Sequence, residues 1–511
     1  MKKSVFQAVA LVSVLSIVTR VLSFVFKIYL SRAYGADAVG LYQIGISIFF
    51  LFAAFPASGL PLAVSRRVAE ITGDGNERKE FSLVSSAAVV GLLISAAVTV
   101  VFFAFPKIFN LMFADKRVIP IFQIMLPALF STTVYCVLRG WFWGRKRFLV
   151  FGFTELLEEV FRIVFSVLFA GGVISAVNGA TGIALAFLVS DAASALTLAL
   201  LYFIKGGRFT APRDIKTTVK SAAPITAMRV FGNIVGSLSA VIIPQRLVAA
   251  GVSATQATAE YGRVAGMAIP LLLAPLALIG SIAVVLIPEL ASDKKANPSL
   301  LSQKINRSLS ASVLITGLFL AVYLPFGKEI GVLLYNDAAA GLYLRFSAIL
   351  MLPIGINQIG ATVLNSIGLE GKSFLSFILG TALMIVLVFF LPKYIGIYAV
   401  AVGTGACYTV TSVMNLRLMK KHIGMSLAFL KTTVLAAAFC GPTAFIAVWL
   451  RNIAASVLNE TVATVLCMAV AALLYLTLVW CFDLVDIQGF LKKRNNSTSS
   501  QRAKRKKSVS F

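Results

Sequence analysis

The sequence predicts an all-α, polytopic membrane protein with about fourteen transmembrane helices. Of its 511 residues, 59% are hydrophobic and only 13% are charged, and the mean hydropathy is +0.92. This composition is too apolar for a soluble protein. Apolar stretches of about 20 residues, long enough to cross a bilayer as helices, also recur along the whole chain with short connections between them.

The expected helices follow one another with little chain between them. They lie near residues 8–30, 39–62, 82–105, 119–141, 151–174, 179–204, 219–238 (continuing towards 249), 262–287, 309–325, 342–367, 374–391, 396–419, 427–450 and 462–482. The connections leave no room for a folded domain outside the membrane. We therefore expect the function to reside within the bilayer.

Lysine and arginine are concentrated at the N-terminus, in alternate loops and in the C-terminal tail, whereas the opposite loops carry few. The positive-inside rule then places both termini in the cytoplasm. The formal net charge of +26 is thus mainly a topology signal, and we do not expect a nucleic-acid partner.

The sequence offers little for metal or covalent chemistry. The five cysteines form no C-x-x-C pair, and His422 is the only histidine, which argues against a zinc site or a disulfide scaffold. Gly371-Lys372-Ser373 lacks the first glycine of a phosphate-binding loop. We therefore predict neither a cofactor nor a metal, and no enzymatic activity.

The first helix carries two cations inside its apolar run. With a rise of about 1.5 Å per residue, Arg20 lies roughly 18 Å from Ala8, near the middle of the hydrocarbon core. A charge there costs about 2.5–3.5 kcal/mol, so Arg20 is expected to face a hydrated lumen. Lys27 follows two turns later on the same face and is expected to line that lumen too, although its long side chain can instead reach the interface.

Further cations occur in the second half of the chain. Arg229 lies roughly 15 Å into the seventh predicted helix, and we expect it in the lumen. The alternative is a structural ion pair or hydrogen bonds to backbone carbonyls. Arg246 and Arg263 lie nearer the outer helix ends, so they are weaker candidates for substrate binding, because snorkelling to the interface also explains them.

The fifth predicted helix contains a charged cluster, Glu155, Glu158, Glu159 and Arg162. The spacing places all four side chains on one face and allows Glu158 to pair with Arg162. The cluster is predicted either to bind a coupling proton or Na⁺, or to close the lumen by pairing with its cations. A purely structural alternative is neutralisation by the preceding basic loop and the helix N-terminus.

A faint repeat relates the first and seventh predicted helices. Thr19-Arg20-Val21 is similar to Met228-Arg229-Val230. This repeat predicts an N-terminal lobe over residues 1–205 and a second six-helix lobe over 206–425. Two extra helices are expected over 426–485, followed by a basic, disordered cytoplasmic tail over 486–511.

Several segments together resemble a known family. They are SIVTRVLSF (16–24), SRAYG (31–35), GLPLAVSR (59–66), IPQRLVAAG (243–251) and ATAEYG (257–262). In this order they are similar to the SpoVB- and MurJ-like polysaccharide branch of the multidrug/oligosaccharidyl-lipid/polysaccharide (MOP) exporter superfamily. The similarity extends over nearly the whole chain.

The resemblance implies a two-lobed, V-shaped flippase in the bacterial cytoplasmic membrane that moves undecaprenyl-pyrophosphate-linked sugars by alternating access. Arg20 falls on the first-helix arginine of the family's cationic cavity. Lys27 falls where MurJ-like sequences have a carboxylate after a second arginine, so the resemblance does not imply an identical arrangement of the phosphate clamp. Implied partners are the lipid-linked saccharide, membrane lipids and cell-wall synthesis proteins, with coupling to Na⁺, H⁺ or the membrane potential.

The sequence leaves three rival functions open. A cation-coupled multidrug exporter of the same superfamily would be expected to carry acidic residues in its lumen, whereas the first helix here has none. A membrane-embedded sugar polymerase or transferase needs an acid and base outside the bilayer, which the short loops do not offer. A non-transporting scaffold for cell-wall synthesis would leave the buried cations unexplained.

Overall fold

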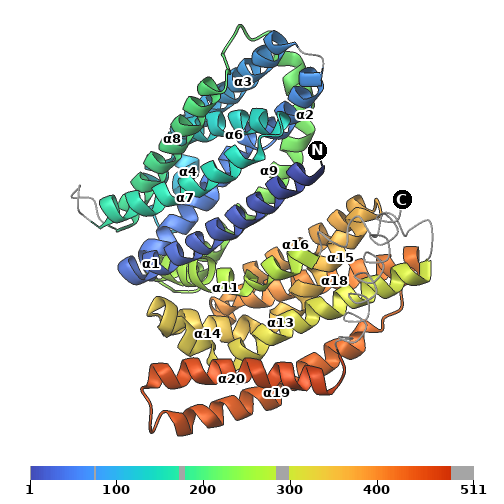
Figure 1. Ribbon diagram of the computed structural model, residues 1–511. Coiled ribbons are helices and arrows are strands. Elements are labelled where there is room, and N and C mark those ends of the chain that lie inside the picture. The colour runs from blue at the N-terminus through green and yellow to red at the C-terminus, as the bar shows by residue number, and fades with distance from the viewer. Residues whose placement is uncertain (1, 74–75, 172–178, 283–297, 485–511) are drawn as a thin grey trace, which may run out of the picture. The chain divides into compact units, whose positions relative to one another are not determined.

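The computed structural model describes residues 2–73, 76–171, 179–282 and 298–484, and within these ranges it is built of helices without strands. This confirms the predicted all-α class. The predicted tail over 486–511 lies outside the described residues. The chain forms two compact units, which we call unit 1 and unit 2 (Figure 1).

Unit 1 comprises Met1–Pro270, Leu334–Ala340 and Leu383–Gly403. Its helices are α1 (Lys2–Ala57), α2 (Leu60–Gly73), α3 (Glu77–Ala104), α4 (Pro106–Met112), α5 (Val118–Met125), α6 (Ala128–Gly144), α7 (Phe148–Ala170), α8 (Gly179–Ile204), α9 (Ile215–Ala249) and α10 (Ala254–Tyr261), then the π-helix η1 (Gly262–Ala268) and the short α17 (Pro392–Ile395). The helix α11 (Ile269–Leu273) begins at the end of this unit.

Unit 2 comprises Leu271–Leu333, Gly341–Ala382 and Thr404–Phe511. It contains most of α13 (Pro298–Tyr335), α14 (Ala338–Ser347), the 3₁₀ turn η2 (Ala348–Leu350), α15 (Met351–Ser366), α16 (Glu370–Phe390), α18 (Tyr398–Ile423), α19 (Phe429–Ala454) and α20 (Glu460–Cys481). The helices α19 and α20 lie side by side at the C-terminal end (Figure 1). Arg451 of α19 bridges Glu329 of α13 at 3.2 Å and Glu460 of α20 at 2.8 Å, and this fixes the pair to α13.

Eleven described helices are long and apolar enough to cross a membrane, or up to twelve if the bent pair α5 and α6 forms one span. The predicted count of fourteen is therefore not confirmed. Two features explain the difference. The first two predicted segments are joined within α1, and α7 carries the four charges at Glu155, Glu158, Glu159 and Arg162, which lower its apolar character.

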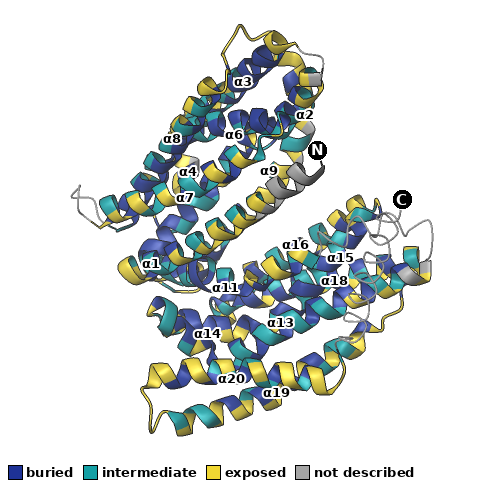
Figure 2. Cartoon of the chain, viewed as in Figure 1, coloured by how far each residue is buried: buried dark blue, intermediate teal, exposed yellow. Residues whose placement is uncertain are grey.

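The exposure of apolar side chains also fits a membrane-embedded chain. Along α8 and α20, large apolar residues such as Leu196 and Leu473 are exposed (Figure 2). In water, apolar faces of this length on several helices would promote association, whereas lipid chains solvate them. The exposed faces therefore support the assignment as a multi-span membrane protein.

The core of unit 1 contains a buried polar network at the ends of α3 and α6 that the basic loops predict to be cytoplasmic. Trp141, Phe142 and Tyr202 are fully buried, and the indole nitrogen of Trp141 donates to the carboxylate of Glu80. Arg145 donates from its Nε to the same carboxylate at 2.7 Å. Because Glu80 is itself buried, these donors replace the water that its charge requires.

Two glycines determine where α1 bends and how closely it packs against α10. Gly35 has φ 74° and ψ 178°, which kinks the long helix between its two predicted spans, and a side chain would be strained in this conformation. One turn later, Gly40 packs against the backbone of Thr258, where an added Cβ would lie only 2.1 Å from a carbonyl oxygen. The second half of α1 therefore lies directly against α10.

Side chains of α9 also bind the second half of α1. Asn233 donates to the carbonyl of Phe50 at 3.2 Å, and the Ser237 hydroxyl donates to the carbonyl of Ser47 at 2.7 Å. Unit 1 therefore includes α9 and α10, which the internal repeat assigns to the second lobe. The lobe boundaries predicted at 205/206 and 425/426 concern the parts that move during transport. They stay a prediction, because the contacts within one structure do not test them.

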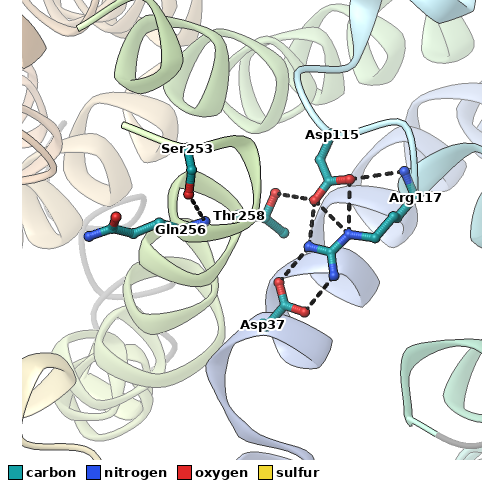
Figure 3. A network of polar contacts seen from close by, with 6 residues as sticks. All are labelled: Asp37, Asp115, Arg117, Ser253, Gln256 and Thr258. Carbon is teal, nitrogen blue, oxygen red and sulfur yellow. Dashed lines mark hydrogen bonds and ion pairs between the residues drawn. The ribbon is translucent and has the colours of Figure 1, made fainter. Parts of the chain in front are cut away.

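An ion-pair network lies beside this junction (Figure 3). Arg117 binds Asp37 of α1 through two N–H groups at 2.9 and 2.8 Å, and it binds Asp115 with its Nε at 3.1 and 3.0 Å. The hydroxyl of Thr258 on α10 donates to Asp115 at 3.2 Å. One guanidinium thus joins the α4–α5 loop, the α1 kink and, through Asp115, α10.

The network depends on the ionised form of Asp115. Burial raises the pKa of this carboxyl, but the hydrogen bonds and charge of Arg117 outweigh it and hold the pKa below its usual value. The same contacts raise the pKa of Arg117. Because the pKa of Asp115 is lower in the folded protein than in the unfolded chain, ionised Asp115 stabilises the folded state. This stabilisation is present at neutral pH and is lost as the pH falls below about 4.

We predict that Arg117→Gln destabilises unit 1 by about 1–2 kcal/mol, because it removes charged hydrogen bonds from a partly exposed pair. The thermal unfolding temperature of the purified protein in detergent, compared at pH 7, measures this. The matched control is Lys116→Gln, an exposed cation next in the chain, which should leave the unfolding temperature unchanged. Equal stability of the two variants would contradict the role of the network.

Candidate functional site

Within unit 1, α7 presents the charged face that its spacing predicts. Arg162 donates to Glu158 at 2.6 Å and to Glu159 at 3.0 Å, so it pairs with the acids four and three residues before it. The Glu159 side chain is only 6% exposed. A carboxylate at this depth needs such a partner, because burial of an unpaired charge is costly.

The first helix adds Lys27 and Tyr42 to this face. Lys27 is half-buried and interacts electrostatically with Glu159. Tyr42 is buried and interacts with Arg162. Nearer the start of α7, Gly152 has no side chain, and Leu15 of α1 packs against it.

The eighth helix contributes a carboxylate that sequence analysis missed. Asp191 is buried and accepts hydrogen bonds from the hydroxyls of Ser131 and Thr132 on α6, the latter at 3.0 and 3.1 Å. It also interacts electrostatically with Glu158 and Arg162. A lone carboxylate inside the apolar stretch 179–204 was the available signal, because such residues are rare in membrane helices.

Further cations lie within electrostatic range of this group of side chains. Glu155 interacts electrostatically with Arg139 of α6 and with Arg20 of α1, which is itself exposed. Arg229 of α9, also exposed, interacts with Cys136, one turn from Arg139 on α6. In the sequence, Arg139 lies at the end of an apolar stretch next to a basic loop, a position typical of a cytoplasmic topology residue.

The structure thus brings most of the predicted site residues together and separates two from the rest. We call the following nine residues the central charged cluster: Arg20, Lys27, Arg139, Glu155, Glu158, Glu159, Arg162, Asp191 and Arg229. It combines five cationic side chains with four carboxylates. Its excess of positive charge is compatible with an anionic ligand.

Arg246 and Arg263 bind other groups. Arg246 donates to the carbonyl of Phe389 at 2.8 Å and stacks on that ring, with its guanidinium carbon 4.0 Å from the centroid. Arg263 pairs with Asp337 and Glu260, each at 2.8 Å. Contact of Arg246 and Arg263 with substrate stays a prediction. In this structure, their guanidinium groups connect different segments of unit 1.

The acidic residues of the cluster do not resemble a metal centre. Among the described residues, no group of three His, Cys, Asp or Glu side chains is arranged to hold a metal ion. Glu158 and Glu159 bind Arg162, and Asp191 binds hydroxyls. The cluster is therefore suited to holding an anion with its cations or to exchanging a proton or monovalent cation on its carboxylates.

The chain is similar to known proteins in sequence and in fold. The chain matches the family described as "Polysaccharide biosynthesis protein" over residues 5–294. It is 25% identical to stage V sporulation protein B of Bacillus subtilis (strain 168) over 497 residues, which cover 92% of this chain and 93% of that protein.

Solved structures with similar folds include two classes of transporter. The structure titled "Lipid II flippase MurJ, inward closed conformation" matches with a TM-score of 0.73 at 14% identity and covers 93% of this chain and 98% of that one. An inward-facing multidrug resistance MATE family transporter of the MOP superfamily matches with a TM-score of 0.67 at 16% identity, over 81% and 96% of the two chains. Both confirm the predicted transporter fold.

We predict that Arg162→Gln destabilises the protein by about 3 kcal/mol, because it leaves two carboxylates without their cation. The double variant Arg162→Gln with Glu159→Gln should recover part of that loss, since one of the unpaired charges is removed. Thermal unfolding in detergent compares the three proteins. A double variant that is no more stable than Arg162→Gln would contradict the charge-pairing account.

Proposed function

Because the chain belongs to the polysaccharide biosynthesis protein family, within the SpoVB- and MurJ-like branch of the MOP superfamily, we propose that it is a flippase. Its substrate is an undecaprenyl-pyrophosphate-linked sugar precursor, such as lipid II or a related wall or polysaccharide intermediate. It carries this lipid across the bacterial cytoplasmic membrane without covalent chemistry.

The observation that carries this proposal is the excess of cations in the central charged cluster. A pyrophosphate headgroup loses hydration when it enters a low-dielectric slab, and guanidinium groups in a hydrated lumen compensate for that loss. Arg20 and Arg229 are both exposed, so their side chains are accessible to such a ligand. The ion-paired Arg162 is less available, because two carboxylates already bind it.

Transport then follows from different affinities of two conformations for the headgroup. A ligand shifts a conformational equilibrium only by as much as its affinities for the two states differ. We propose that the junction of α1 with α9 and α10 is intact in one state and opens in the other. The side chains of Asn233 and Ser237 donate to backbone carbonyls of α1 across this junction, and Gly40 packs against Thr258. The difference in headgroup affinity between the two states must therefore outweigh these contacts.

The carboxylates of the cluster can serve the transport cycle in one of two ways. Glu155, Glu158 and Glu159 either exchange a coupling proton or Na⁺, or neutralise the lumen cations between transport events. Membrane potential can also bias the movement of charged groups. The Glu158–Arg162–Glu159 bridge favours neutralisation for these two acids, because both are already paired.

A second candidate is a cation-coupled multidrug exporter of the same superfamily. The fold similarity to a MATE transporter and the buried Asp191 favour it, because cationic drugs need acidic partners. The larger number of cations in the cluster argues against it. Binding of a cationic dye in preference to pyrophosphate lipids would decide for this alternative.

We predict that Arg20→Ala and Arg229→Ala each abolish flipping, because each removes a cation that compensates for headgroup desolvation. A fluorescent lipid-linked saccharide in vesicles containing the purified protein measures transport through the loss of protection from an external quencher. Lys116→Gln, in an exposed loop, is the control. Full transport by the Arg20→Ala, Arg229→Ala double variant would refute the cationic-lumen proposal.

We also predict that Glu158→Gln keeps the dependence of transport on a Na⁺ or proton gradient, because Glu158 serves Arg162 as a counter-charge. The measurement is the transport rate in the same vesicles with each gradient imposed or collapsed. Loss of the gradient dependence, with transport retained, would instead assign ion coupling to Glu158.

A further inference from the structure

The apolar helical span over Ala254–Ile282 contains a wide turn between α10 and α11. At the end of η1, the backbone N–H of Ile269 donates to the carbonyl of Val264, five residues earlier, as in a π-helix. Such a turn holds one residue more than an α-helical turn, and π-helical turns are frequent at functional sites. If η1 became α-helical, α10 would rotate relative to α11 by about 100° and shift along the axis by about 1.5 Å.

The sequence makes two registers of this turn similar in backbone hydrogen bonding. In the observed register, Ile269 bonds to Val264, and the carbonyl of Ala265 lacks a donor five residues later because Pro270 has no N–H group. In an α-helical register, Ile269 would bond to Ala265. The carbonyl of Gly266 would then lack its donor, and the proline ring would crowd it. One carbonyl loses its backbone donor in either register, so Pro270 and tertiary contacts decide between them.

The end of α13 supplies these tertiary contacts. The hydroxyl of Tyr335 donates to the carbonyl of Met267, inside the wide turn, at 3.0 Å, and both residues are buried. Asn336 is left-handed, with φ 56°, and Asp337 follows it and pairs with Arg263 of η1 at 2.8 Å. Two neighbouring residues therefore bind η1 at two points. Each contact depends on the direction in which the η1 group points, so both favour the observed register.

The first helix also packs on η1 in this register. A Cβ added at Gly262 would lie 2.3 Å from the carbonyl oxygen of Ala36, and one added at Gly266 would lie 2.3 Å from the side chain of Val39. The two glycines are four residues apart, so they share one helix face. A rotation of about 100° would turn Gly262 away from α1 and bring a residue with a side chain into its place. The contact with α1 would then be lost.

Building on the proposed function, we propose that η1 is a register switch that closes and opens the junction of α1 with α10. In the observed register, Tyr335 and Asp337 hold η1 as a π-helix, and its glycine face binds α1. In the other register, η1 is α-helical, the Tyr335 bond is broken and α10 turns away from α1. A substrate that binds more tightly to one register than to the other then drives the junction.

Distances between two spin labels on the purified full-length protein in detergent test this switch. One label replaces the exposed Gln256 on α10, and the other replaces the exposed Leu196 on α8, in a background whose five native cysteines are replaced by alanine. A label about 5–6 Å from the helix axis moves by roughly 8 Å when α10 rotates by about 100°. The wild type should show one dominant distance, which corresponds to the π-helical register.

Two substitutions should favour the other register. Pro270→Ala supplies the missing N–H group and removes the ring, whereas Tyr335→Phe removes only the hydroxyl that binds Met267. Each should add a second distance, displaced by roughly 8 Å. The matched control is Tyr323→Phe, because Tyr323 lies on the same helix and donates to the carbonyl of Leu271 at 3.3 Å, beyond the wide turn. Its distances should equal those of the wild type.

A single, unchanged distance in both Pro270→Ala and Tyr335→Phe would overturn the switch, and so would an equal displacement in Tyr323→Phe. The result is also separate from the flippase proposal. If the two variants displace the label but the protein carries no pyrophosphate-linked saccharide in the vesicle assay, the switch stands and the proposed substrate fails. If transport occurs while the distance ignores both substitutions, the flippase proposal survives and the switch is refuted.

Discussion

The arrangement of unit 1 depends on the free-energy cost of placing charge where water is scarce. An isolated charge at the centre of a bilayer is costly, so each ionisable side chain needs a counter-charge, a hydrogen-bond donor or acceptor, or access to water. Arg162 meets this need through two carboxylates, and Asp191 through two hydroxyls. Arg20 and Arg229 are exposed instead. The cluster therefore combines paired charges with accessible cations, and this combination suits the anionic substrate that we propose.

Close helix packing brings the first helix alongside α7. Gly152 lets Leu15 of α1 approach α7, and cations of the first helix lie within electrostatic range of acids 130 or more residues later in the chain. The same long helix binds α9 through hydrogen bonds to its carbonyl groups. The helix that carries the proposed substrate cations is thus also the helix whose contacts with α9 and α10 we propose to change during transport.

The sequence alone predicted the helical class, the membrane location and the charged face of α7, because hydrophobic length and helical spacing determine them locally. Its placement of Arg20 and Arg229 in one lumen stays a prediction, and in the structure both residues are exposed. It did not predict the partners of Arg246 and Arg263, because Phe389 and Asp337 come from distant segments. Nor did it predict Arg139, whose position after an apolar stretch is equally typical of a cytoplasmic anchor. Such contacts depend on tertiary packing, which periodicity does not encode.

We propose that the cations of the cluster bind a pyrophosphate headgroup. An experimental structure of the purified protein with bound undecaprenyl pyrophosphate tests this directly. We expect phosphoryl density within hydrogen-bonding distance of Arg20 and of at least one further cation of the cluster, with the prenyl chain leading away from it. Phosphoryl density confined to the lipid-facing surface, away from every cation of the cluster, would refute the proposal.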